Sequence, residues 1–384
     1  MTDFNDYAPP PSAHQMACWL SESQELTLSL LDDLSSEMLD IRQSEKVNLP
    51  LWEFGHVAWF SELWIHRKGL SDNPSFLKGS DHFYNSSNIA HDTRWQLELP
   101  NVTQTRSYLV GIFNQTQSLL VNSIDLQTAY FVQLAIFHQD MHNEAFAYTR
   151  QSLGYPLPEH LQKRFEEKKL EIETLNTLLS SRGDIEFDAR SFQMGAQPGQ
   201  GFFFDNEKWS HTVALEPFAI SPSLVTNQEI IDFLSQAGAD LKPEYWEFRS
   251  GEWFERRFTQ WRKLSPQAIA VHLSYDLAQA YCAWKGRRLP TEAEWQCLGE
   301  SSAFHSGQVA HSFTWEWTSS VFSPFVGFSS DPYHDYSEPW MDGHHQVLRG
   351  ASWITPDRMK RPGYRNFYQK HRSDIFCGFR TCAM

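Results

Sequence analysis

The sequence has few cysteines, no long apolar run and a shortage of positive charge, and each shortage narrows what the protein can be. Its 384 residues hold only five cysteines, scattered along the chain. That number excludes a disulfide framework in a chain of this length and indicates reduced thiols. The longest apolar stretch, around residues 130–137, is far shorter than the roughly 20 residues that a membrane helix needs. We therefore expect no membrane partner.

Basic residues are outnumbered by acidic ones. Lys and Arg total 32 against 47 Asp and Glu, which gives a net charge of −15. Nucleic-acid binding depends on a clustered basic surface, so nucleic acid is excluded as an expected partner. The first residues, MTDFNDYAPPPSAHQ, are acidic and proline-rich, whereas a secretory signal opens with positive charge followed by an apolar core. The cytoplasm is the expected compartment.

What the chain does contain is enough apolar material for two cores, since 41% of its residues are hydrophobic and 15% aromatic. Apolar residues recur at helical spacing in most of the first 180 residues. Four amphipathic helices with one long crossover predict an antiparallel four-helix bundle, and a fifth, charged helix leads out of it. We expect these helices at residues 13–42, 50–68, 103–122, 125–153 and 159–179.

The texture of the sequence changes near residue 182. Segments become short, aromatic and punctuated by Gly, Pro, Asn and Asp, and a helical pattern survives only near residues 226–236 and 275–285. This half is expected to be mixed and rich in loops. We predict an α+β protein of two domains, residues 1–182 and 183–384.

Three histidines of the first half form the clearest candidate site. His138 and His142 are four residues apart on an expected helix, so two imidazoles can share one metal ion. His56 lies on the apolar stripe of the second expected helix and faces the same core. Three protein ligands leave metal positions open for substrate and dioxygen, unlike a closed structural zinc site. The alternative is that His56 is a hydrogen-bonded core histidine and the pair lies on a solvated face.

Several motifs of the second half resemble the formylglycine-generating-enzyme-like domain, a variant of the C-type-lectin fold. They are Phe192–Gly195, Phe204–Glu207 with His211, Val225–Glu229, Gly286–Trp295, Trp315–Thr318, Val347–Trp353, Tyr364–Asn366 and Gly378–Arg380. The first half resembles a DinB-type bundle, with Gly55-His56 and the histidine pair followed by Glu144. This fusion is similar to the ergothioneine-type sulfoxide synthases, nonheme iron enzymes that use dioxygen to join a sulfur compound to the imidazole of hercynine (trimethylhistidine).

The resemblance implies that His56, His138 and His142 bind Fe(II). Within the family, residues 84–95 and 374–382 look closest to selenoneine synthase, which implies a selenosugar such as selenoglucose as the chalcogen donor. The sulfur enzymes that use γ-glutamylcysteine hold donor carboxylates with arginines after the second helix, and here only Arg94 stands clear, beside His91. The alternative is a sulfoxide synthase that uses cysteine or γ-glutamylcysteine.

The resemblance also implies further substrate contacts. The loop at residues 325–336 and the segment 365–368 are expected to cover the iron site, with Asn366 holding hercynine and Phe367-Tyr368 in place of the Trp-Asp that is common in the family. Tyr333 or Tyr336 matches the tyrosine that donates a proton or hydrogen atom in the sulfur enzymes. Met141 replaces a Gln before the second histidine of the pair and would offer soft packing to a bound imidazole.

Other readings stay open at this point. A copper-dependent formylglycine-generating oxidase would use Cys377 and Cys382, and a noncatalytic binding module would carry at most a structural metal. Glu144 is a candidate for a supporting role behind the histidines. Thr291, three residues before Glu294, predicts a capping box that opens a helix. A monomer or small homo-oligomer is expected.

Overall fold

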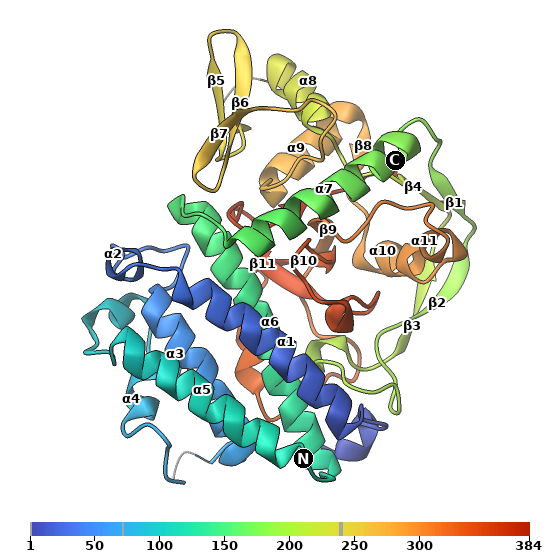
Figure 1. The fold of residues 1–384 in the computed structure, drawn as a ribbon. Helices are drawn as coiled ribbons and strands as arrows, with labels where there is room; N and C mark the ends of the chain where they lie inside the picture. The colour runs from blue at the N-terminus through green and yellow to red at the C-terminus, as the bar shows by residue number, and fades with distance from the viewer. Residues whose placement is uncertain (1, 71–72, 238–240) are drawn as a thin grey trace. The chain divides into compact units, whose positions relative to one another are not determined.

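The computed structural model describes residues 2–70, 73–237 and 241–384 (Figure 1). The chain divides into two units. Unit 1 comprises Met1–Ser152 with Pro198–Phe203, and unit 2 comprises Leu153–Gln197 with Phe204–Met384. The segment Pro198–Phe203 belongs with the helices because its aromatic rings pack on them. The ring of Phe202 lies 4.9 Å from that of Phe137, and the ring of Phe203 lies 4.7 Å from that of Tyr7. The predicted mixed fold, with a helical N-terminal part and a loop-rich part after it, is confirmed.

Unit 1 is built from helices, four of them long. Its elements in chain order are η1 (Phe4–Tyr7), α1 (Ala13–Asp32), α2 (Ser36–Leu39), α3 (Pro50–Ser61), the π-helical turn η2 (Glu62–His66), α4 (Ser80–Tyr84), η3 (His91–Gln96), α5 (Val102–Leu119) and α6 (Leu126–Leu153). Their starts follow local rules. Ser12 and Asn101 accept hydrogen bonds from the first turns of α1 and α5, and Pro50 occupies the first turn of α3, where it loses no hydrogen bond.

The first helix is shorter than its sequence pattern predicts. We expected it to run to residue 42, but α1 ends at Asp32. The side chain of Ser35 accepts a hydrogen bond from Met38 N and thereby opens the separate short helix α2. A capping serine competes locally with continuation of a helix, although the apolar spacing continues past it.

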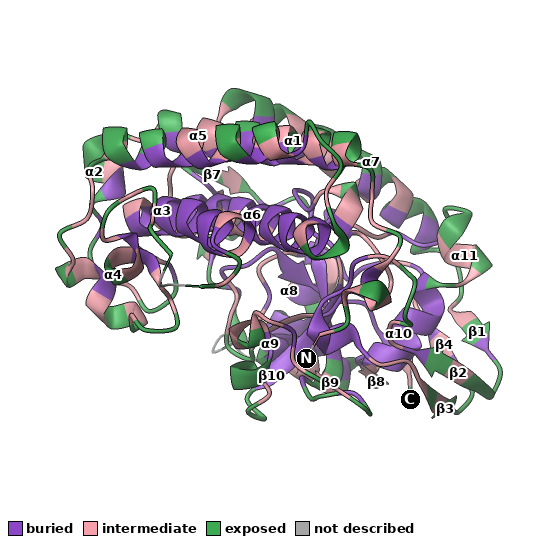
Figure 2. Cartoon of the chain, turned by 90° about the horizontal axis from the view of Figure 1, so that it is seen from below, coloured by how far each residue is buried: buried purple, intermediate pink, exposed green. Residues whose placement is uncertain are grey.

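Burial shows how the bundle is layered. In Figure 2, α6 is purple along most of its length, whereas α1 and α5 are buried on one face and exposed on the other. α3 is buried almost throughout. The two central helices α3 and α6 are therefore the place where polar groups can be shielded from water.

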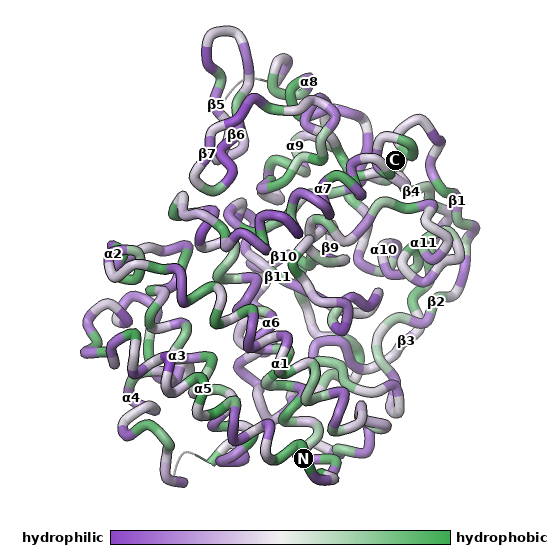
Figure 3. Tube along the Cα trace, viewed as in Figure 1, coloured by the Kyte–Doolittle hydropathy of each residue, from purple (hydrophilic) through white to green (hydrophobic). Residues whose placement is uncertain are grey.

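The predicted charged helix is present as α7 (Glu159–Leu179), which is mainly hydrophilic in Figure 3. We expected it in the first domain, residues 1–182, whereas it belongs to unit 2, which begins at Leu153. The predicted helices of the second half are confirmed as α8 (Asn227–Ala237) and α9 (Tyr275–Lys285). α10 (Glu292–Gly299) begins with the predicted capping box between Thr291 and Glu294. A short helix, α11 (Ser302–His305), follows.

The strands of unit 2 form four small sheets. The first has the order β1-β4-β13-β8, the second β11-β10-β9-β12, and β2-β3 and β5-β6-β7 are antiparallel. The strands are β1 (Ile185–Phe187), β2 (Arg190–Met194), β3 (His211–Leu215), β4 (Phe218–Ile220), β5 (Trp246–Arg249), β6 (Glu252–Arg257), β7 (Gln260–Lys263), β8 (Arg287–Arg288), β9 (Trp315–Val321), β10 (His345–Gly350), β11 (Asn366–Gln369), β12 (Cys377–Gly378) and β13 (Cys382–Ala383). In the second sheet Leu348 faces Trp317 across the antiparallel pair, and both are fully buried.

The 3-10 turns of unit 2 lie in its loops. They are η4 (Asp205–Glu207), η6 (His334–Tyr336), η7 (Glu338–Trp340) and η8 (Asp357–Met359). Across the described ranges, no helix combines the length and apolarity needed to cross a membrane.

Candidate metal centre

α3 places His56 inside the bundle. The helix is apolar on nearly every side, and His56 is only 3% exposed. Gly55 precedes it because the fully buried ring of Tyr84 occupies the space that any larger side chain would need. The Nδ1–H of His56 donates to the carbonyl oxygen of Tyr84, 2.8 Å away.

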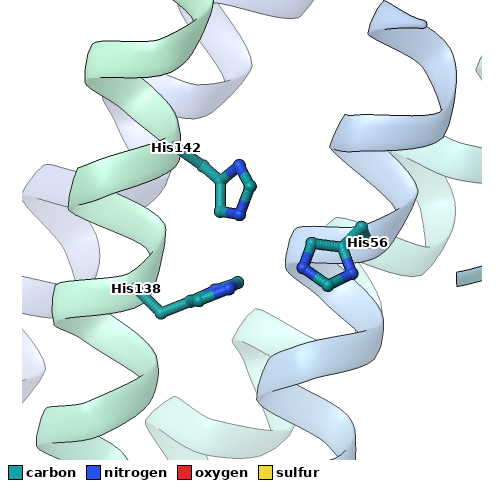
Figure 4. A group of neighbouring side chains, drawn as sticks. All are labelled: His56, His138 and His142. Carbon is teal, nitrogen blue, oxygen red and sulfur yellow. The ribbon is translucent and has the colours of Figure 1, made fainter. Parts of the chain in front are cut away.

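α6 presents the other two histidines from one face (Figure 4). The ring centres of His138 and His142 lie 4.5 Å apart. The ring centre of His56 lies 5.2 Å from that of His138 and 5.1 Å from that of His142. One ring nitrogen of each histidine lies within 4.8 Å of the corresponding nitrogens of the other two. Residues from two helices, more than 80 positions apart in sequence, are thus brought together as the spacing predicts.

Aromatic packing fixes two of the three rings. Trp52 stacks on His56 with ring centres 4.9 Å apart, and Phe60 stacks on His138 at 3.5 Å. Burial lowers the pKa of both His56 and His138 well below the usual value, so both rings are neutral near pH 7. Neutral imidazoles carry the lone pairs that metal ions bind, so these residues fit a divalent transition metal.

Sequence reasoning missed the acidic partner of His142. Glu53, one turn before His56 on α3, is 1% exposed, and its Oε1 lies 2.6 Å from His142 Nδ1. The residue proposed for a supporting role was Glu144, which is also buried. The signal that could have found Glu53 is its i,i+3 spacing from His56, because residues three apart share a helix face.

The crossover residues predicted to bind substrate contact protein groups of unit 1. The guanidinium of Arg94 lies 3.7 Å from the ring centre of Trp52 and donates to the side-chain oxygen of Asn48. The Nε2–H of His91 donates to the carbonyl of Ser44 at 2.7 Å. Met141 is partly exposed on α6, directly before His142. Their roles toward substrate stay predictions.

Unit 2 brings together several of the C-terminal candidates. The Tyr336 and Tyr364 hydroxyls lie 3.2 Å apart, and the Tyr333 ring centre lies 6.2 Å from that of Tyr336. Burial raises the pKa of Tyr336 well above its usual range, so its phenol stays protonated. Phe367 stacks on Phe322 at 4.0 Å.

The remaining two candidates lie on β11. The side-chain oxygen of Asn366 accepts a hydrogen bond from Phe367 N at 2.9 Å, and the guanidinium of Arg372 lies 5.1 Å from the Tyr368 ring. The substrate contacts predicted for Asn366, Tyr368 and the two tyrosines Tyr333 and Tyr336 remain predictions.

A buried polar cluster anchors the loop that carries the two candidate tyrosines, and no sequence motif predicts it. Asp205 accepts a hydrogen bond from the Ser337 hydroxyl, which also accepts one from Asn206. Lys208 Nζ lies 2.5 Å from Asp331 Oδ1. Burial is the main cause that raises the pKa of Asp205 to about 6, and the nearby Asp331 adds to it.

The two C-terminal cysteines, the candidates for a copper site, are buried in separate strands. Cys377 lies in β12 and Cys382 in β13, strands of two different sheets, and both are fully buried. Burial raises the pKa of the Cys377 thiol far above its usual range and that of Cys382 to about 12. Burial therefore keeps both as thiols at neutral pH in the metal-free chain, and a copper ion would have to displace both protons.

Known proteins are similar to this chain over one part or over its whole length. Residues 179–310 match the sulfatase-modifying factor enzyme 1-like domain, FGE-sulfatase. A hercynine oxygenase of Mycobacterium tuberculosis is 26% identical over 442 residues, covering 96% of this chain and 98% of that protein. Ergothioneine biosynthesis protein 1 of Schizosaccharomyces pombe is 28% identical over 210 residues, 47% of this chain and 27% of that protein.

A formylglycine-generating enzyme of Streptomyces coelicolor is 31% identical over 148 residues, but this similarity covers only 30% of the present chain and 46% of that protein. The similarity to the hercynine oxygenase, by contrast, extends over both halves of the chain. These similarities support the ergothioneine-type sulfoxide synthase family of oxidoreductases, which the chain resembles along nearly its whole length.

Proposed function

We propose that this protein is an Fe(II)- and dioxygen-dependent enzyme that joins selenium from a selenosugar to the imidazole carbon of hercynine, as a selenoneine synthase. The observation that carries the proposal is the cluster of His56, His138 and His142 in the bundle, each with a ring nitrogen within 4.8 Å of the others. Full-length similarity to a protein named hercynine oxygenase supports hercynine as the acceptor.

The three histidines would hold the iron, whose chemistry is one-electron transfer and activation of dioxygen. The chain supplies the surroundings. Burial keeps His56 and His138 uncharged, so their lone pairs need no proton release before a metal binds. Trp52 and Phe60 cover one face of these two rings and exclude water from them.

The crossover favours a donor without carboxylates. Its two arginines are engaged: Arg67 forms two hydrogen bonds with Asp81, and Arg94 lies over Trp52 and binds Asn48. A γ-glutamylcysteine donor carries two carboxylates, which arginines bind in paired hydrogen bonds, whereas a selenosugar carries no carboxylate. This supports selenoglucose over the thiol donors.

Residues of unit 2 are proposed to serve the substrates. Asn366 would bind the amino-acid end of hercynine, and the aromatic faces of Phe367 and Tyr368 suit its trimethylammonium, which has no hydrogen to donate. Tyr336, kept protonated by burial, is a suitable proton donor, and Tyr333 is the other candidate.

The test is a competition assay. The purified protein is loaded anaerobically with Fe(II), given hercynine with equal selenoglucose, cysteine and γ-glutamylcysteine, and exposed to oxygen, and the products are weighed by mass spectrometry. We expect the selenium adduct to dominate, and His56→Ala to abolish oxygen uptake. A dominant sulfur adduct would overturn the selenium assignment, and absence of any hercynine product would overturn the enzyme assignment.

A further inference from the structure

In both His56 and His142, the ring nitrogen Nδ1 is held by a hydrogen-bond acceptor. His56 Nδ1 lies 2.8 Å from the carbonyl oxygen of Tyr84, and His142 Nδ1 lies 2.6 Å from Glu53 Oε1. A carbonyl or carboxylate oxygen only accepts, so in each ring Nδ1 carries the proton. Each ring therefore presents Nε2, with its lone pair, for binding.

Glu53 links the two central helices. It lies three residues before His56, on the same side of α3, and its carboxylate reaches His142 on α6. One face of α3 thus provides both the imidazole of His56 and the carboxylate of Glu53, which orients the imidazole of His142. A carboxylate this deeply buried is costly unless paired, so the contact with His142 restricts both side chains.

The acceptor for His56 is a backbone atom, and its position depends on α4. Trp52 Nε1 donates to the carbonyl of Phe83 at 2.6 Å, and Trp59 Nε1 donates to Asp81 Oδ1 at 2.7 Å. Arg67, itself buried, donates to both oxygens of Asp81 at 3.0 and 2.8 Å. These bonds fasten α4 to both ends of α3 and to Arg67, which follows η2, and they hold the Tyr84 carbonyl against His56.

We propose that Glu53 and Asp81 are positioning residues: Glu53 aims His142 directly, and Asp81 aims His56 by holding α4 and its Tyr84 carbonyl in place. This inference rests on the proposed metal site but assigns residues that touch neither metal nor substrate. Loss of such supporting hydrogen bonds weakens metal binding about 10- to 100-fold in other proteins.

The experiment is a Co²⁺ titration of the full chain. Calorimetry and the visible absorption of the bound ion measure the affinity. Glu53→Leu keeps much of the volume but removes the acceptor, and we expect about 10- to 100-fold weaker binding. Glu53→Gln keeps an oxygen that can accept from Nδ1 and should retain most of the affinity. Asp81→Ala should weaken binding by a similar factor.

The matched control is Asp33→Ala. Asp33 pairs with the buried Arg150 on the same bundle, so this variant also breaks an ion pair of a buried arginine, but away from the histidines. We expect its Co²⁺ affinity to equal that of the wild type, with circular dichroism confirming that all variants fold.

A second measurement works without metal. In protein labelled with ¹⁵N-histidine, nitrogen shifts should report the Nδ1–H form of His142 in the wild type and a mixture of forms in Glu53→Leu. If wild-type protein binds no Co²⁺, the proposed function fails. If the wild type binds and His142→Ala does not, yet Glu53→Leu and Asp81→Ala match the wild type in affinity, the positioning roles are wrong and the metal site stands.

Discussion

Replacing Asp205 with asparagine should change how the stability of unit 2 depends on pH. Burial raises the pKa of Asp205 from 3.8 to about 6, and the charge of Asp331 adds to the rise, while the hydrogen bond from Ser337 opposes it. In the unfolded chain the same carboxyl ionises near its ordinary value. The folded state therefore binds more protons between about pH 4 and 6, and its stability falls as the pH rises through that window.

The magnitude follows from the shift. Each unit of pKa difference corresponds to about 1.4 kcal/mol, so the full effect is roughly 3 kcal/mol, of which roughly 2.4 kcal/mol falls between about pH 4 and 7.5. The asparagine side chain of the variant would not titrate, and it keeps an oxygen for Ser337. Its amide would face the Asp331 backbone N–H, which lies 3.4 Å from Asp205 Oδ2, but that cost is the same at every pH. The diagnostic quantity is therefore the slope.

The assay is urea unfolding from pH 4 to 7.5, followed by tryptophan fluorescence. Ten of the 15 tryptophans lie in unit 2, so the signal follows this unit. The stability of Asp205→Asn relative to wild type should rise by about 2 to 3 kcal/mol across the range. The control is Asp188→Asn, at an exposed site, with a constant difference expected. A constant difference for Asp205→Asn as well would refute the reasoning.

Three further predictions test the folds of the two units. Gly55→Ala should destabilise unit 1 by about 1–3 kcal/mol in urea unfolding, because the new methyl group overlaps the buried Tyr84 ring. An unchanged midpoint of urea unfolding would show that the ring can move. Native protein should react with one equivalent of Ellman's reagent, at the exposed Cys18, and with five equivalents after denaturation; a second fast thiol would contradict the buried state of the others. Thr291→Ala should cost about 1 kcal/mol of unit 2 stability by removing the cap that pairs with Glu294, whereas Thr291→Ser should cost less.

The sequence predicts most helices of this protein because their signals are local. Apolar spacing and start signals placed α5, α6, α7 and α9 within a few residues of their observed ends. The exception, α1, shows the limit of spacing alone. Its periodic pattern continues beyond Asp32, yet the capping side chain of Ser35 starts a new helix. Periodicity describes which face would be buried, not whether the backbone stays helical.

The histidine cluster could be predicted, but its surroundings could not. Side chains four apart on a helix must share a face, and a third on another core helix must point inward. By contrast, the Tyr84 carbonyl leaves no trace in a side-chain pattern, since every residue has one. Asp205 and Ser337 are 132 positions apart, so only the folded topology joins them.

These unpredicted contacts explain how an open three-ligand cluster can persist in a core. Imidazoles that point their lone pairs at one another would lower their energy by turning away, and side-chain torsions offer that freedom. Here two kinds of contact remove that freedom of the side-chain torsions. Trp52 and Phe60 stack on the rings of His56 and His138. His142 is hydrogen-bonded to Glu53, and His56 to the Tyr84 carbonyl. The entropy of ordering the ligands is therefore lost when the bundle folds and not when a metal arrives. The crossover helix α4, which carries none of the three histidines, thereby supports the candidate metal centre.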